Sequence, residues 1–88
     1  MKYTKYFSII SKEYGQPKLD NYQFGRMMNI IHIEGVIQGI EQIRNGYKNT
    51  PEYTRFDLII FKQNKKLTEL TGNIKPEDLL KEMLSFSE

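Results

Sequence analysis

The chain has 88 residues, of which 39% are hydrophobic, and a net charge of +2, which suits one domain with a single small core. It contains no cysteine, so a disulfide framework, a thiolate zinc site and a cysteine nucleophile are excluded. The charge is too mild to indicate nucleic-acid binding by itself, and no apolar run approaches the roughly 20 residues of a membrane-spanning helix. We expect a soluble, cytoplasmic protein without a signal peptide, folded as a single helical domain over residues 1–88.

Three glycines, each followed closely by a proline, divide the chain into four segments. The pairs are Gly15 with Pro17, Gly46 with Pro51, and Gly72 with Pro76. A glycine just after one helix and a proline near the start of the next is the usual asymmetry of helix ends. The punctuation therefore predicts four helices joined by short loops.

The first segment, about residues 3–14, has the spacing of an amphipathic helix. Lys5 and Lys12 fall opposite its apolar side. That side is formed by Tyr3, Tyr6, Phe7, Ile10 and Tyr14.

The second segment, residues 21–47, is the most apolar stretch and predicts a long central helix with Asp20 or Asn21 as its N-cap. At about 100° per residue, seven apolar side chains fall within an arc of about 140°, which predicts the core face. They are Ile30, Ile33, Val36, Ile37, Ile40, Ile43 and Tyr47. Glu34 and Glu41 fall on the opposite side, where we expect solvent. A second apolar patch of Phe24, Met27 and Ile31 predicts that the early part of this helix is covered from more than one direction.

The third segment opens with Thr50 as N-cap and Pro51 at the first helical position. A heptad seam follows, formed by Tyr53, Phe56, Ile60, Gln63, Leu67 and Leu70. The fourth segment, about residues 76–86, begins with two acids that suit a helix N-terminus. Its apolar side comprises Leu79, Leu80, Met83, Leu84 and Phe86.

These segments predict an all-α fold, a small four-helix bundle with short loops punctuated by glycine and proline. The alternative is an α+β fold. In it, the Asn45-Gly46 pair would form a hairpin turn and residues 56–61 a strand, because isoleucine and valine favour strands.

No constellation of side chains indicates catalysis, so we expect a protein that is not an enzyme and needs no cofactor or metal. His32 is the only histidine, and position 36, where a second helical metal ligand would lie, is Val36. The serines lie in no recognisable nucleophile motif, and no glycine-rich phosphate loop is present.

Two glycines one turn apart, Gly35 and Gly39, are the most distinctive feature of the central helix. Each costs roughly 1 kcal/mol relative to alanine in a helix interior, so a compensating contact is expected. They align with Met28, His32 and Gln42 in a shallow stripe away from the main apolar arc. The favoured interpretation is a tight helix crossing inside the monomer. The functional one is a binding face for a partner protein or for a second copy in a homodimer.

A basic run on the third segment is the basis of the alternative functional hypothesis. Arg55, Lys62, Lys65 and Lys66 are placed to contact phosphates, and residues 66–84 read as a helix, a turn and a second helix. The acids of the fourth segment oppose this reading. The leading hypothesis is therefore a non-enzymatic binding protein, such as an inhibitor, adaptor or immunity-type accessory protein, and the alternative is a small nucleic-acid-binding regulator.

Overall fold

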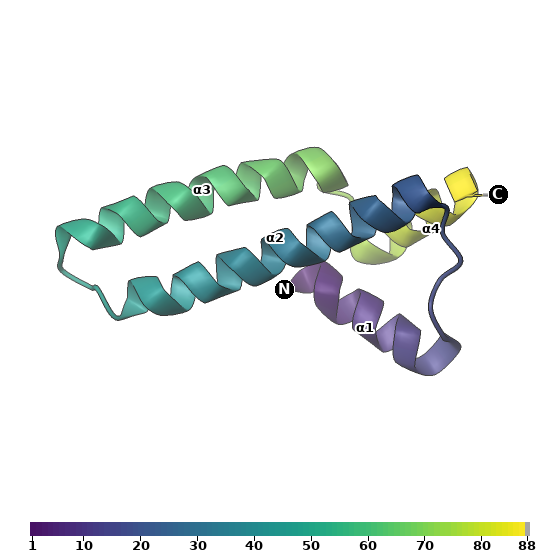
Figure 1. Cartoon of the computed structure of the whole chain (residues 1–88), viewed down its shortest axis with the longest axis horizontal. Coiled ribbons are helices and arrows are strands. Elements are labelled where there is room, and N and C mark those ends of the chain that lie inside the picture. Colours follow the sequence, from purple (N-terminus) through teal and green to yellow (C-terminus); the bar gives the residue numbers. More distant parts are fainter. Residues whose placement is uncertain (88) are drawn as a thin grey trace.

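A computed structural model describes residues 1–87 as four helices, with no strand in that range (Figure 1). The helices are α1 (Lys2–Tyr14), α2 (Asn21–Asn45), α3 (Pro51–Thr71) and α4 (Pro76–Ser87). The all-α prediction is confirmed, and the α+β alternative is wrong at both of its sites. Residues 56–61 lie inside α3, and the Asn45-Gly46 pair ends a helix.

Local chemistry explains where the helices begin and end. The Asp20 carboxylate caps α2 by accepting a hydrogen bond of 2.7 Å from the backbone N–H of Gln23. Gly72 ends α3 in the left-handed conformation, with φ of 63°, which glycine adopts without a steric penalty. Thr50 is the N-cap of α3 as predicted, but its hydroxyl donates to the carbonyl of Tyr47 instead of capping the helix.

The main core lies where α1 and α4 pack against the first half of α2. It is formed by Tyr3, Phe7, Met27, Ile30, Leu79, Leu80 and Met83, of which Ile30, Leu79 and Met83 are fully buried. Within α1 and α4, only the side chains near this junction are covered. Tyr14 and Phe86, predicted on the apolar faces of these helices, are exposed near the ends of their helices.

The helices α2 and α3 form a long antiparallel hairpin that extends beyond α1 and α4 (Figure 1). A second, smaller cluster of Ile33, Ile37 and Ile60 lies between them. Farther out the predicted core face of α2 is wrong, because Ile43 is 52% exposed and Tyr47 is 44% exposed. Tyr47 lies outside α2, which ends at Asn45, and α1 and α4 lie toward the opposite end of the hairpin (Figure 1).

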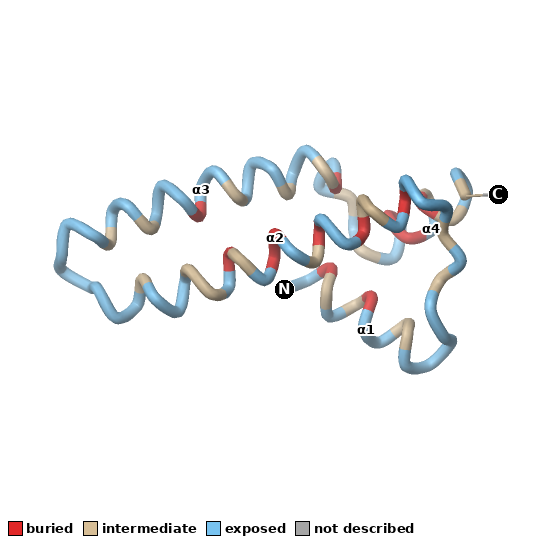
Figure 2. Tube along the Cα trace, viewed as in Figure 1, coloured by how far each residue is buried: buried red, intermediate tan, exposed pale blue. Residues whose placement is uncertain are grey.

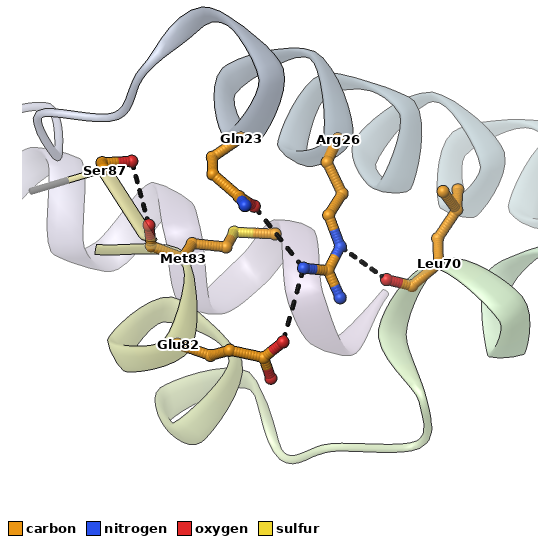
Figure 3. A network of polar contacts seen from close by, with 6 residues as sticks. All are labelled: Gln23, Arg26, Leu70, Glu82, Met83 and Ser87. Atoms are coloured by element: carbon orange, nitrogen blue, oxygen red, sulfur yellow. Dashed lines mark hydrogen bonds and ion pairs between the residues drawn. The ribbon is translucent and has the colours of Figure 1, made fainter. Parts of the chain in front are cut away.

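Arg26 fastens the other end of the hairpin to α4 (Figure 3). Its Nε donates a hydrogen bond of 2.8 Å to the backbone carbonyl of Leu70, in the last turn of α3, where helix carbonyls lack an intrahelical partner. One terminal nitrogen lies 3.6 Å from the Glu82 carboxylate of α4 and 3.5 Å from the side-chain oxygen of Gln23. One cation thus joins three helices.

Candidate functional site: a groove between α1 and α2

The buried carboxylate of Glu34 anchors the N-terminal end of α1 to α2. One oxygen accepts a 3.0 Å hydrogen bond from the backbone N–H of Tyr3, and the other accepts from the backbone N–H and hydroxyl of Thr4, at 2.6 and 2.7 Å. The N-terminus of a helix carries unpaired N–H groups and a partial positive charge, so a carboxylate is stabilised there. Glu34 therefore caps α1 from another helix.

The expectation that Glu34 faces solvent is wrong, since its residue is only 5% exposed. The sequence did contain a signal for this contact. The residue before α1 is Met1, which makes no side-chain capping bond, and the first turn of α1 has no acid. A helix without a local cap leaves N–H groups that another part of the chain must satisfy.

Anchored at this end, α1 and α2 leave an apolar groove of about 760 Å³ between them, on the side where the loop of residues 15–20 joins them. Its walls carry Phe7, Ile9, Pro17, Phe24, Met27, Met28 and Ile31. Ile9, Phe24 and Met28 are each between 43% and 50% exposed, so three large apolar side chains face solvent together.

Two lysines of α1, Lys5 and Lys12, line the same groove, together with the hydroxyl groups of Ser8 and Ser11. The lysines are seven residues apart, which places them on one side of the helix about two turns from each other. The groove thus has an apolar floor and a positively charged border. No acidic side chain of residues 1–87 lines it.

The structure places the predicted stripe on the solvent side of α2, continuous with the groove. Met28 lies in the groove, while His32, Gly35 and Gln42 are exposed and Gly39 is partly exposed. A Cβ added at Gly35 or Gly39 would meet no atom within 4 Å outside its own stretch of helix. The favoured interpretation, a tight crossing inside the monomer, is therefore wrong, because no helix of the described chain approaches these glycines.

The second predicted set, Arg55, Lys62, Lys65 and Lys66, is exposed along the outer side of α3. At about 100° per residue the four positions fall within an arc of about 100°. Lys66 also lines a shallow cavity of about 510 Å³ between α3 and α2, where it shares the lining with His32 and Glu69. One member of each predicted set thus contributes to this cavity.

An ion pair holds the two helices of the hairpin together near its outer end. A terminal nitrogen of Arg44 lies 2.5 Å from a carboxylate oxygen of Asp57. This hydrogen bond raises the pKa of the Arg44 guanidinium, which stays charged at all physiological pH values. The pair fixes the axial register of α2 relative to α3, so residues near Arg44 lie beside residues near Asp57.

The sequence did not identify most of the groove. Phe24, Met27 and Ile31 were recognised as an apolar patch on a second side of α2, but only Met27 is buried. Lys5 and Lys12 fall opposite the apolar side of the first segment, where the sequence gives no sign of a groove. Their importance depends on the angle between α1 and α2, which no local pattern in the sequence encodes.

Across residues 1–87, no group of three histidine, aspartate or glutamate side chains is gathered closely enough to hold a metal ion. Over the same range, no helix combines the length and apolarity required to cross a bilayer. Comparison of the chain with protein-family models, curated proteins and solved structures found no match.

Proposed function

We propose that this chain is a non-enzymatic binding protein that captures a protein partner in the groove between α1 and α2. The observation that carries the proposal is the joint exposure of Ile9, Phe24 and Met28 over an apolar groove. Apolar side chains grouped in a concave surface mark sites of recognition more often than isolated ones do. Methionine suits such a surface because its flexible, polarisable side chain adapts to different partners.

The chemistry of the groove favours an amphipathic helix with acidic residues beside its apolar stripe. An apolar floor accepts the apolar stripe, as in other helix-in-groove complexes. Lys5 and Lys12 favour carboxylates on the flank of that helix and disfavour basic segments. The roles of inhibitor, adaptor and immunity-type accessory protein all match this mode of binding.

The stripe of Met28, His32, Gly35, Gly39 and Gln42 extends the same surface along α2. From Phe24 to Gln42 a helix rises by about 27 Å, the length of a partner helix of about 18 residues. Since a Cβ at Gly35 or Gly39 would meet no atom of another helix within 4 Å among residues 1–87, a partner backbone has room to approach α2 closely there.

The test is selection from a displayed library of amphipathic helices that vary in their apolar stripe and flanking charge. We expect enrichment of helices with Asp or Glu beside the stripe. Their affinity should fall at least about tenfold for Met28→Lys and for the double variant Lys5→Glu, Lys12→Glu. Leu58→Lys, on an exposed apolar side chain of α3 outside the groove, is the matched control. Absence of enrichment, or equal binding by Met28→Lys, would refute the proposal.

A second candidate function is nucleic-acid binding by the outer side of α3. It is supported by the exposure of Arg55, Lys62, Lys65 and Lys66, none of which forms an ion pair with a described residue. Four phosphate contacts would give a binding constant that falls steeply with salt. A gel shift at two salt concentrations tests it, and absence of salt-sensitive DNA or RNA binding excludes it.

A further inference from the structure

The outer half of the α2–α3 hairpin is a helix pair over which neither α1 nor α4 extends (Figure 1). Between residues 38 and 59 no side chain is buried, and Figure 2 shows this end of the hairpin in exposed and intermediate colours only. The stretch nevertheless contains Ile40, Ile43, Tyr47, Tyr53, Phe56, Leu58 and Ile59. Two helices cover only one side of each other, and helices in proteins owe most of their stability to tertiary contacts.

The shape of the whole molecule reflects this open end. Its radius of gyration is 15.1 Å, against about 12 Å for a compact domain of this length. Its accessible surface is 6365 Å², against about 5,400 Å² for a typical monomer of this mass. The excess of about 900 Å² is close to the roughly 800 Å² that each partner contributes to a standard interface.

The two flanks of the hairpin differ in chemistry. One is polar, since Gln38 and Glu41 of α2 meet Asn64 and Thr68 of α3 in the lining of a cavity. The other begins at the shallow cavity that contains Val36 and Lys66, and it turns apolar toward the outer end. We call this side the apolar flank, and its members are Val36, Ile43, Tyr47, Phe56 and Ile59.

The members of the apolar flank lie together because of helix periodicity. Ile43 follows Val36 by seven residues, about two turns, so both lie on the same side of α2. Ile59 precedes Lys66 by seven residues, so both lie on the same side of α3. The rings of Tyr47 and Phe56 are in contact, with centroids 5.4 Å apart. Ile43 is 52% exposed and Ile59 is 40% exposed, so the patch is open to solvent.

We infer that a second copy of this chain covers the apolar flank, with the two hairpins antiparallel about a twofold axis near Ile59. The outer halves then form a four-helix bundle, in which each hairpin supplies the missing layer of the other. The proposal does not depend on the groove, because neither Ile43 nor Ile59 lines it.

The order of charges along α3 favours a second copy over an unrelated partner. Glu52 and Lys66 lie seven residues to either side of Ile59, on the same side of the helix. When two copies of α3 run antiparallel across an axis at Ile59, each Glu52 lies beside the Lys66 of the other copy. The same register places Arg55 beside Gln63, with the Lys62 of the other copy one position away, so Glu52 and Lys66 are the opposite charges that pair across the axis.

The α2 helices fit the same axis. The Arg44–Asp57 pair and the contact of Tyr47 with Phe56 set α2 and α3 in register, so Ile43 lies level with Ile59. An axis at this level brings Ile43 and Ile59 of both copies to the centre of the interface. Exposed apolar side chains at the centre and charges toward the rim are the usual anatomy of an interface.

Light scattering coupled to size exclusion tests the assembly of the full chain. We expect a mass of about 21 kDa, twice the 10.5 kDa of one chain. Ile43→Glu and Ile59→Glu should halve that mass while far-UV circular dichroism remains helical. Leu58→Glu, one residue from Ile59 but on the outer side of α3, should stay dimeric. A wild-type mass of 10.5 kDa at every concentration, or a dimer that survives both Ile43→Glu and Ile59→Glu, would overturn the inference.

Charge exchange tests the register without altering the apolar flank. Glu52→Lys and Lys66→Glu should each weaken dimerisation about tenfold, because each change acts at two symmetric positions, and the double variant should restore it. Since the chain has no cysteine, Ile59→Cys should also oxidise to a covalent dimer, while Leu58→Cys should not. Failure of the double variant to restore dimerisation, or cross-linking by Leu58→Cys alone, would overturn the antiparallel arrangement.

Discussion

Replacing Glu34 by alanine should destabilise the protein more than any other single change of a charged residue. The substitution leaves the backbone N–H groups of Tyr3 and Thr4 without acceptors, together with the Thr4 hydroxyl. Hydrogen bonds to a charged group contribute about 1.5–3 kcal/mol each, and a buried donor without a partner costs about 1–3 kcal/mol.

The net loss of unfolding free energy should be about 2–4 kcal/mol, because removing the carboxylate also removes its own desolvation cost. A domain of this length has a total stability of about 4–13 kcal/mol, so the change is a large fraction of the whole. Glu34→Gln keeps one acceptor oxygen and should lose about half as much.

Urea denaturation followed by far-UV circular dichroism measures the difference. Glu41→Ala is the matched control, since Glu41 lies two turns along the same side of α2 but is exposed. It should change stability by no more than about 0.5 kcal/mol. If Glu34→Ala were no more destabilising than Glu41→Ala, the assignment of Glu34 as the cap of α1 would be refuted.

Three further predictions test the fold. Arg26→Met keeps an apolar stem but removes the hydrogen bond to the Leu70 carbonyl and the contact with Glu82. It should lower the free energy of unfolding by about 1–3 kcal/mol in the same denaturation assay. An unchanged denaturation midpoint would contradict the role of Arg26 in joining the three helices. Gly35→Ala and Gly39→Ala should each stabilise the free protein by up to about 1 kcal/mol, which raises the melting temperature by at most about 4–8 °C, because the added methyl group meets no atom of another helix. A lowered melting temperature would show that a helix does approach these glycines. Ile30→Ala should lower the free energy of unfolding by about 2–5 kcal/mol, because this side chain is fully buried. Leu58→Ala, at an exposed position, should lower it by less than about 0.5 kcal/mol. Equal effects would contradict the placement of the main core.

Local signals in the sequence determined the helices. The side chain of Asp20, the prolines and the conformational freedom of Gly72 act within a few residues of where they stand, so the ends of all four helices could be placed to within about two residues. Periodicity also identified Phe7, Ile30 and Met83 as core residues, because a helix that faces a core must repeat its apolar side chains on one side.

Only the tertiary structure decided which of the apolar faces is covered. The pattern of α2 continues unchanged from Ile30 to Ile43, yet the first is fully buried and the second is half exposed, since α1 and α4 reach only one end of the hairpin. The same arrangement buries Glu34 on a side that reads as polar and opens the groove at Phe24 and Met28. Periodicity specifies the direction in which a side chain points, whereas burial depends on what lies in that direction, and the position of another helix is a long-range property that no local spacing contains.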